Sequence, residues 1–216
     1  MRDFTNAKEL VSVTPYEEMD LAELKERRLY LNGYVDNVEA LFDGYPHEDV
    51  VTGLAYYILK YNREDKGLPV EERKPIILYI NSPGGSVING YVLVDTILAS
   101  KTPVYTVNFG ECASMGFLIF LAGHKRFSLP RAQYLLHDGG LFSGYESTAK
   151  ARDRMDFNSE KLEPMTKEYV LSRTTISPEL YDENYRVEWY MLPEEAKEYG
   201  IVHSILSVDC DIDDII

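Results

Sequence analysis

The feature that most constrains the fold is a strand, a turn and a helix that occur twice in succession in the middle of the chain. The apolar, β-branched run at 76–80 leads into a Pro-Gly-Gly turn and then into apolar residues at helical spacing over 87–99. A second such run, at 104–107, leads into a turn of small residues and an apolar segment over 115–123. This alternation predicts right-handed βαβ units around a largely parallel sheet, and therefore an α/β fold. Ligands bind such sheets at the carboxyl ends of the strands, so we expect the functional site at these two turns.

Other segments extend this pattern on both sides. The sequence predicts helices over 19–27, 48–62 and 193–198, and strands over 28–31, 126–129, 131–137 and 201–206. The charged segment 147–173 keeps apolar residues in a roughly helical rhythm and predicts a long helix that projects from the domain. We expect Pro164 to kink or divide this helix, because an interior proline removes a hydrogen bond and clashes with the preceding turn. The acidic end at 209–214 is expected to be frayed.

Composition argues against several classes of protein. A chain of 216 residues is long enough for the buried core of one α/β domain. The net charge of −14 and the isoelectric point near 4.7 argue against a nucleic-acid-binding protein, since phosphate contacts need clustered Lys and Arg. Cys112 and Cys210 stand far apart, which favours free thiols in a reducing compartment over a disulfide or a zinc site. We expect no metal and no cofactor.

The sequence has no segment with the pattern of a signal peptide or a membrane span. The N-terminal residues lack an apolar core, and the apolar stretch at 117–122 is much shorter than the ~20 residues of a membrane-spanning helix. The sequence therefore predicts a cytoplasmic protein without a membrane partner.

A candidate nucleophile lies in the second turn. Ser114 stands in the heptapeptide Gly-Glu-Cys-Ala-Ser-Met-Gly at 110–116, directly after a strand and before an apolar helical segment. Small neighbours and the following Gly116 let the backbone turn sharply. The hydroxyl then lies at a helix N-terminus, where unpaired N–H groups are available for an oxyanion.

A candidate base and a second set of donors come from two other turns. His137 follows the apolar run 133–136, and the chain then breaks at Asp-Gly-Gly over 138–140, which predicts a histidine exposed at a strand end. The first turn contains Gly84 and Gly85, which can expose backbone N–H groups to a substrate. A serine, a histidine and backbone donors at one end of a sheet are the groups that nucleophilic acyl transfer needs.

Five ordered motifs together resemble the Clp protease proteolytic subunit over about 24–206. They are Tyr-Ile-Asn-Ser-Pro-Gly-Gly at 79–85, Ala-Ser-Met-Gly at 113–116, Arg-Phe-Ser-Leu-Pro at 126–130, Leu-His at 136–137 and Glu-Glu-Ala-Lys-Glu-Tyr-Gly-Ile-Val at 194–202. The resemblance implies the ClpP/crotonase-like fold of repeated ββα and βαβ units with a projecting handle helix. It also implies self-association into two stacked seven-membered rings, a tetradecamer, fed with unfolded polypeptides by a hexameric AAA+ unfoldase of the ClpX, ClpA or ClpC type.

The resemblance also implies roles for individual residues. Ser114 matches the nucleophile and His137 the general base, and the oxyanion donors fall on the backbone N–H groups of Gly85 and Met115. Tyr79 falls in the surface groove where such subunits bind the unfoldase.

The organisation that the resemblance implies has three parts. Residues 1–18 are expected to form loops at the axial pore, 19–208 the peptidase domain, and 209–216 an acidic C-terminal tail. Within the peptidase domain, the head comprises 19–140 and 174–208. The handle, 141–173, is expected to interleave between the two rings.

The third catalytic residue departs from the family pattern. The family's acid, which orients the histidine, falls on Asn184 in this sequence. The asparagine side-chain oxygen can accept a hydrogen bond from Nδ1–H of His137, but it supplies no negative charge to stabilise an imidazolium. Asp182 lies two residues earlier and takes the same place if the loop shifts, so both candidates stay open.

Two hypotheses about function follow. In the first, the chain is a serine endopeptidase that hydrolyses unfolded polypeptides and short peptides, with Ser114 as the attacking group. In the second, the unusual third residue makes the chain a weakly active or inactive paralogue, which serves as a structural subunit of a complex with a second, more active paralogue. Thioester chemistry on the crotonase scaffold is disfavoured, because it needs a carboxylate base where Ser114 stands.

Overall fold

The computed structural model describes residues 21–35, 50–140 and 147–215. The strands are β1 (Arg28–Asn32), β2 (Ile76–Ser82), β3 (Val104–Ala113), β4 (Lys125–Ser128), β5 (Gln133–Leu136), β6 (Trp189–Met191) and β7 (Ser204–Ile205). The α-helices are α3 (Val50–Glu64), α4 (Val87–Ala99), α5 (Met115–Leu121), α6 (Thr148–Phe157), α7 (Glu163–Arg173), α8 (Pro178–Asn184) and α9 (Pro193–Glu198). Residues 21–25 are also helical, and shorter turns are η2 (Val70–Glu72), the π-helical η3 (Asn158–Leu162) and η4 (Ile212–Asp214).

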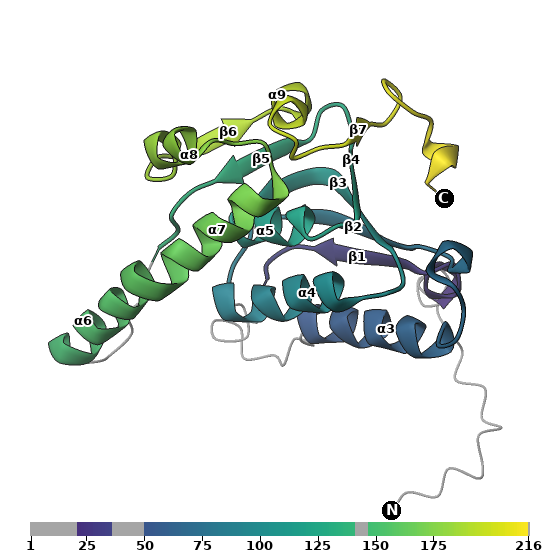
Figure 1. Ribbon diagram of the computed structural model, residues 1–216, viewed down its shortest axis with the longest axis horizontal. Coiled ribbons are helices and arrows are strands. Elements are labelled where there is room, and N and C mark those ends of the chain that lie inside the picture. The colour runs from purple at the N-terminus through teal and green to yellow at the C-terminus, as the bar shows by residue number, and fades with distance from the viewer. Residues whose placement is uncertain (1–20, 36–49, 141–146, 216) are drawn as a thin grey trace, which may run out of the picture.

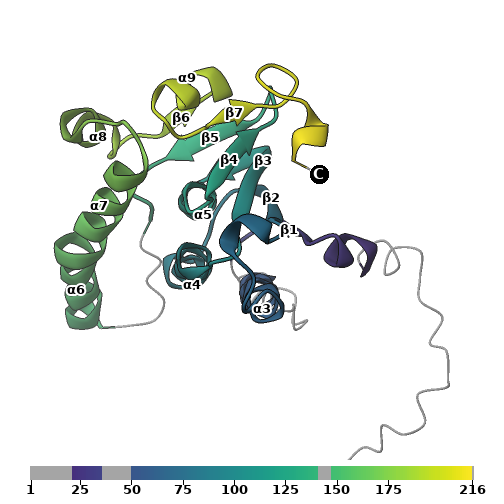
Figure 2. The same cartoon turned by 45° about the vertical axis from the view of Figure 1, so that its right-hand side comes forward.

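One sheet, with seven strands in the described part of the chain, organises the fold (Figure 1, Figure 2). The strands β1, β2, β3, β4 and β7 lie side by side in that order, and all of these pairs are parallel. β3 is longer than predicted, because its second half runs past β4 and pairs with β5. β5 in turn pairs antiparallel with β6. The α/β fold with a largely parallel sheet, predicted from the sequence, is therefore confirmed.

Apolar side chains cover both faces of the sheet. On β2, Ile76, Leu78 and Ile80 belong to the main core, whereas Ile77 and Tyr79 belong to a smaller apolar cluster. Alternate residues of a strand point to opposite faces, so the two clusters lie on opposite sides of the sheet. α3 and α4 pack together below the sheet in Figure 1, and α5 contacts β3, β5 and α7. The continuous apolar run of β2 is explained by this burial on both faces.

The charged segment forms the projecting helix that the sequence predicts. α6, η3 and α7 run in one line away from the sheet, with α6 at the far end (Figure 1). Regular α-helical bonding is interrupted by the π turn directly before Pro164, which lies in the first turn of α7. Because proline has no N–H to donate, the helix is divided at this point rather than sharply bent. The expected first residues of the handle, 141–146, and the expected axial-pore segment, 1–18, lie outside the described residues.

Two elements in the C-terminal part have no counterpart in the sequence prediction. α8 begins after Ser177, whose side chain accepts a hydrogen bond from Leu180 N, and β6 is three residues long. The predicted strand over 201–206 is shorter in the structure, where Ser204–Ile205 pairs with β4. Elements this short depend on tertiary packing more than on a periodic pattern.

The prediction of a frayed acidic end is wrong. Asp209 pairs with Lys197 Nζ at 2.5 Å and accepts a hydrogen bond from Ile205 N at 2.7 Å. Further along, Ile215 is buried in the smaller apolar cluster that also contains Tyr79. Residues 211–214 stay exposed, but Asp211 and Asp214 form a capping box in η4, and the buried Ile215 fixes the end of the segment.

Candidate active site

Ser114 lies at the end of β3 and occupies the N-cap position of α5. Its backbone has φ 53° and ψ −121°, which lies outside the regions that residues other than glycine normally adopt. Its N–H donates to Leu135 O at 2.9 Å, and its carbonyl oxygen accepts from Phe117 N at 3.1 Å. Backbone strain of this kind costs on the order of 1–3 kcal/mol and is concentrated at functional sites. The surrounding structure therefore fixes this serine in a conformation that its local preference opposes.

Two glycines allow the serine turn to lie against the end of β2. A Cβ on Gly84, whose φ is +97°, would lie 2.7 Å from Ser114 Cβ and 2.8 Å from Met115 N. A Cβ on Gly116 would lie 2.9 Å from Ser82 O. A side chain at either position would push the serine turn away from the turn that follows β2, so close approach of the backbone requires glycine at both.

Two backbone N–H groups that border the same cavity as Ser114, those of Gly85 and Met115, make no hydrogen bond within the described residues. Val35 N donates to Gly84 O at 2.8 Å, and Ser86 N donates to Val35 O at 3.1 Å. This pattern of a parallel bridge leaves the N–H of Gly85 pointing away from Val35. The N–H of Met115 is in the first turn of α5, where a helix offers no internal acceptor. Within the described residues, neither N–H has a hydrogen-bond acceptor.

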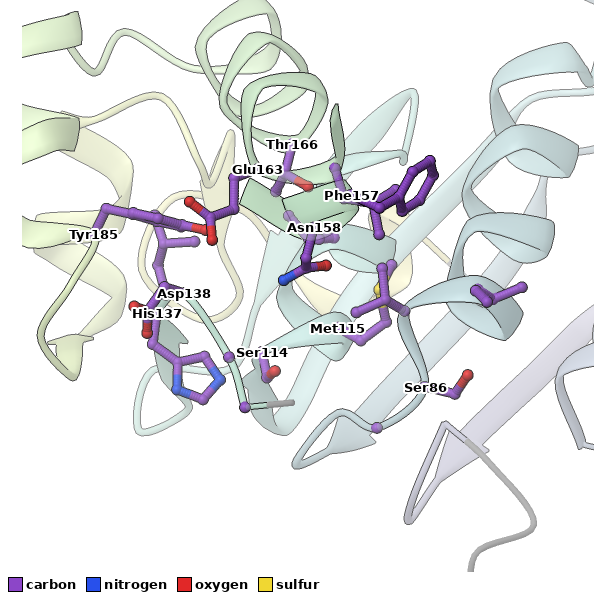
Figure 3. Close-up of a pocket in the computed structure, with 18 of the residues that line it drawn as sticks. Ser86, Ser114, Met115, His137, Asp138, Phe157, Asn158, Glu163, Thr166 and Tyr185 are labelled. Atoms are coloured by element: carbon purple, nitrogen blue, oxygen red, sulfur yellow. The ribbon is translucent and has the colours of Figure 1, made fainter. Parts of the chain in front are cut away.

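His137 directly follows β5, and its imidazole points toward Ser114 (Figure 3). Its Nδ1 lies 3.0 Å from Glu188 Oε1. This contact follows from strand register: Leu136 pairs with Trp189, so the adjoining residues His137 and Glu188 face each other just beyond that antiparallel pair. Nε2 is buried and has no hydrogen-bond partner among the described residues. The imidazole therefore has one nitrogen held by a carboxylate and the other available on the serine side.

The structure joins neither of the two sequence candidates for the third residue to His137. Asn184 Nδ2 donates to Leu180 O at 2.9 Å within its own helix. Asp182 pairs with Lys167 Nζ at 2.5 Å on the surface. The expectation that Asn184 or Asp182 contacts His137 is therefore corrected: in the structure Glu188 makes that contact. Counting along the family motif misses this residue, because the contact depends on the pairing of β5 with β6, and β6 is not predicted.

Two arginines hold the other end of α5. Arg126 is buried and its Nη1 donates to Leu121 O at 3.2 Å. Arg173, at the end of α7, donates from Nε to Leu121 O at 3.1 Å and from Nη2 to Gly123 O at 2.8 Å. Burial lowers the pKa of Arg126 to about 10. Cations at a helix C-terminus complement its partial negative charge, so these residues fix the helix that carries Ser114 at its start.

Cys112 lies two residues before Ser114 but is a component of the core. It is fully buried, and this burial raises the pKa of its thiol well above the ordinary value. A thiol that stays protonated and inaccessible is a poor nucleophile, so Cys112 serves as a small core side chain.

A cavity of about 320 Å³ opens beside Ser114 and His137, between α5 and the handle (Figure 3). Its lining residues are Gly85, Ser86, Val87, Ile88, Ser114, Met115, Leu118, Leu136, His137, Asp138, Gly139, Gly140, Arg154, Phe157, Asn158, Leu162, Glu163, Thr166 and Tyr185. The nucleophile, base and oxyanion candidates that three separate turns supply thus meet at one cavity. No cluster of metal-ligating side chains occurs in the part of the chain that the structure describes.

Comparison with known proteins identifies the family. Residues 68–209, well over half of the chain, match the family described as Clp protease. The chain belongs to the Clp protease family. A relative from Treponema pallidum (strain Nichols), named ATP-dependent Clp protease proteolytic subunit 2, is 33% identical over 141 residues, which are 64% of this chain and 70% of the relative. The part matched to the Clp protease family contains Ser114, His137 and Glu188.

The residue that the Clp protease resemblance assigns to partner binding, Tyr79, lies on the sheet face opposite the main core. Only 8% of its surface is exposed, because its ring stacks on Tyr30 and meets the edge of Phe109. Tyr30 and Phe109 are themselves 45% and 52% exposed. The exposed part of this aromatic patch is therefore formed mainly by Tyr30 and Phe109, with Tyr79 as the ring that joins them.

None of the described helices is both long and apolar enough to cross a membrane.

Proposed function

We propose that this chain is the serine peptidase subunit of a Clp-type protease. The observation that carries the proposal is the strained Ser114 turn at a cavity that Gly85 and His137 also line. The N–H groups of Gly85 and Met115 make no hydrogen bond within the described residues. An arrangement that stabilises a serine in an unfavourable backbone conformation at the edge of a cavity is typical of a nucleophile.

In the proposed reaction, Ser114 Oγ attacks the carbonyl carbon of a peptide bond and His137 Nε2 takes the hydroxyl proton. The Nδ1–H of His137 donates to Glu188 Oε1, which holds the required tautomer and stabilises the imidazolium. The N–H groups of Gly85 and Met115 bind the oxyanion of the tetrahedral intermediate. The imidazolium then returns its proton to the leaving amine, and water hydrolyses the acyl-enzyme by the same route.

The resting geometry requires one adjustment before this reaction. His137 Nε2 makes no hydrogen bond to Ser114 Oγ in the structure, because it has no partner among the described residues. Catalytic hydrogen bonds are often formed fully only when substrate binds. Rotation of the serine hydroxyl toward the imidazole, driven by substrate in the cavity, completes the pair in our proposal.

We further propose the assembly and partners that membership of this family supports. The chain assembles into seven-membered rings that stack as a tetradecamer, with the handle, α6 to α7, between the rings. An AAA+ unfoldase of the Clp type delivers polypeptides and binds the aromatic patch of Tyr30, Tyr79 and Phe109. Exposed aromatic rings that are already packed against one another favour binding, since little side-chain entropy is lost when a partner covers them.

A structural subunit with little activity of its own is the second candidate. Two observations favour it: His137 Nε2 has no hydrogen-bond partner among the described residues, and the side chain of Glu188 is 57% exposed. A solvent-exposed carboxylate orients an imidazole less firmly than a buried one. In this candidate function, the chain assembles with a second, active paralogue.

Covalent labelling with a fluorophosphonate separates the two candidates. An active peptidase is labelled at Ser114, hydrolyses a short fluorogenic peptide, and loses both properties on Ser114→Ala. Absence of labelling in an assembled complex, or hydrolysis that persists in Ser114→Ala, would contradict the peptidase proposal. Labelling of a mixed complex on the paralogue alone would favour the structural subunit.

A further inference from the structure

The cavity beside Ser114 has an apolar wall next to the nucleophile. Met115, Leu118 and Leu136 line it, and all three are buried, with Leu118 7% and Leu136 2% exposed. Because Ser114 lines this cavity, the side chain of a residue acylated on Ser114 Oγ can enter it. The part of that side chain next to its backbone therefore lies against apolar groups. This contact favours a long side chain with several methylene groups over a short polar one.

The opposite side of the cavity is polar and carries negative charge. Glu163, Thr166 and Tyr185 line it, and Figure 3 shows them across the cavity from Ser114. Thr166 Oγ1 is occupied by the hydroxyl of Tyr91 at 2.8 Å. Burial raises the pKa of Tyr185, and the charges of Glu163 and Asp138 raise it further, so this hydroxyl stays neutral.

Glu163 stands out among these groups. Its side chain is half-buried, and no hydrogen bond or ion pair joins it to another of the described residues. Asp138 adds a second carboxylate to the lining, while Arg154 is exposed on α6 and already interacts with other groups. A half-buried carboxylate without a cation is unfavourable by itself and gains from a cation that enters the cavity.

We propose that this cavity binds the side chain on the amino side of the cleaved bond and that Glu163 selects a long side chain with a cationic end, lysine above all. This specificity rests on the proposed peptidase function, since it concerns the acyl group that Ser114 carries. The methylene groups of the lysine lie along Met115 and Leu118, and the ammonium group meets the Glu163 carboxylate. An acidic side chain of similar length is rejected, because it brings a second negative charge to the same place.

Three peptidyl phosphonates that differ in one side chain test the proposal. They carry norleucine, lysine or glutamate next to the phosphorus, and the measured quantity is the rate of covalent labelling of Ser114. In the assembled wild-type protein we expect the lysine probe to label Ser114 at least about ten times as fast as the glutamate probe. The lysine probe is attracted by the Glu163 carboxylate, whereas the glutamate probe is repelled by it. Norleucine matches lysine in its carbon chain and isolates the contribution of the ammonium group.

Substitutions on the handle identify the residue responsible. Glu163→Gln is expected to reduce the lysine-to-glutamate rate ratio about five-fold or more, and Glu163→Lys to reverse the preference. Glu160→Gln, at an exposed position of the adjoining η3, is the matched control and keeps the wild-type ratio. Labelling of each variant by the norleucine probe verifies that its nucleophile still reacts.

The outcomes separate this proposal from the one on which it rests. Similar rates for the lysine and glutamate probes in the wild type overturn the proposed specificity, while labelling by norleucine still supports a peptidase. A wild-type ratio that Glu163→Lys leaves unchanged also overturns it. If no probe labels Ser114 in the assembled wild type, the proposed function fails and the specificity fails with it.

Discussion

The two halves of the candidate active site are held in different ways. On the nucleophile side, Ser114 is fixed by close approach of Gly84 and Gly116 to neighbouring backbone, and the far end of α5 is fixed by Arg126 and Arg173. On the base side, the one hydrogen bond that the His137 side chain makes within the described residues is the 3.0 Å contact with Glu188, whose side chain is 57% exposed. In the proposed reaction, the groups that would bind the oxyanion are therefore held by close backbone packing, whereas the group that would move the proton is held by one exposed contact.

This contrast has a physical reason. An oxyanion is stabilised by dipoles that are already in place, so its donors gain most from a rigid backbone. A general base needs only to come within hydrogen-bond distance at the moment of reaction. Substitutions on the nucleophile side should therefore cost more activity than substitutions on the base side.

The largest effect is expected from Gly84→Ala. The new Cβ would lie 2.7 Å from Ser114 Cβ, so either the serine turn or the turn after β2 must move. Displacement of reacting groups by about 1 Å costs on the order of 100-fold in rate, and we expect at least that loss in kcat/KM for a fluorogenic peptide. Gly53→Ala is the control, since a Cβ there meets nothing within 4 Å. Near-normal activity in Gly84→Ala would show that the nucleophile side is not rigid.

A smaller effect is expected from Glu188→Ala. Loss of the carboxylate removes the acceptor for Nδ1–H of His137, and we expect kcat to fall roughly 10- to 100-fold with little change in KM. Glu188→Gln keeps an acceptor oxygen without the charge and should lie between Glu188→Ala and the wild type.

Asn184→Ala is the matched control for the base side. Its amide donates to Leu180 O within α8, so kcat should stay within about two-fold of the wild type. A large loss of kcat in Asn184→Ala together with normal kcat in Glu188→Ala would reverse the assignment.

Arg173→Met tests the support of α5. The substitution removes hydrogen bonds to Leu121 O and Gly123 O, and we expect a loss of about 2 kcal/mol in the free energy of unfolding. Thermal unfolding should show a decrease in Tm of roughly 4–8 °C, with a few-fold loss of activity. Arg152→Met, on the exposed surface of α6, is the control and should leave Tm nearly unchanged. Equal Tm values for the two variants would mean that Arg173 does not support α5.

The smallest effect is expected from Asp182→Asn. Asp182 is 62% exposed and pairs with Lys167 at the surface, and such pairs contribute about 0–1 kcal/mol. We expect activity within about two-fold of the wild type and an almost unchanged denaturation curve. A clear loss of kcat without loss of stability would return Asp182 to the catalytic site.

Elements with a strong local pattern were predictable from the sequence. The apolar runs of β2 and β3 and the helical spacing of α4 agree with the structure, because burial on the sheet faces imposes that pattern. That Ser114 and His137 meet at one cavity was also predictable, because each residue directly follows a strand of the sheet. The carboxyl ends of parallel strands lie at the same edge.

The contacts that the sequence pattern did not predict depend on the pairing of segments in the folded chain. Glu188 faces His137 through the antiparallel register of β5 with β6, a strand of three residues. Lys197 orders the acidic end through Asp209, although charge alone favours solvent there. Neither contact has a periodic signature, because each joins segments through positions that only the folded chain defines.

A crystal structure of the assembled protein after reaction with a peptidyl phosphonate would test the central claim most directly. We predict a bond between Ser114 Oγ and phosphorus, and a phosphoryl oxygen within about 3.1 Å of both the Gly85 and Met115 nitrogens. We also predict that His137 Nδ1 remains bound to Glu188. An adduct whose phosphoryl oxygen points away from both nitrogens, or whose His137 Nδ1 binds Asn184 or Asp182 instead, would contradict the account.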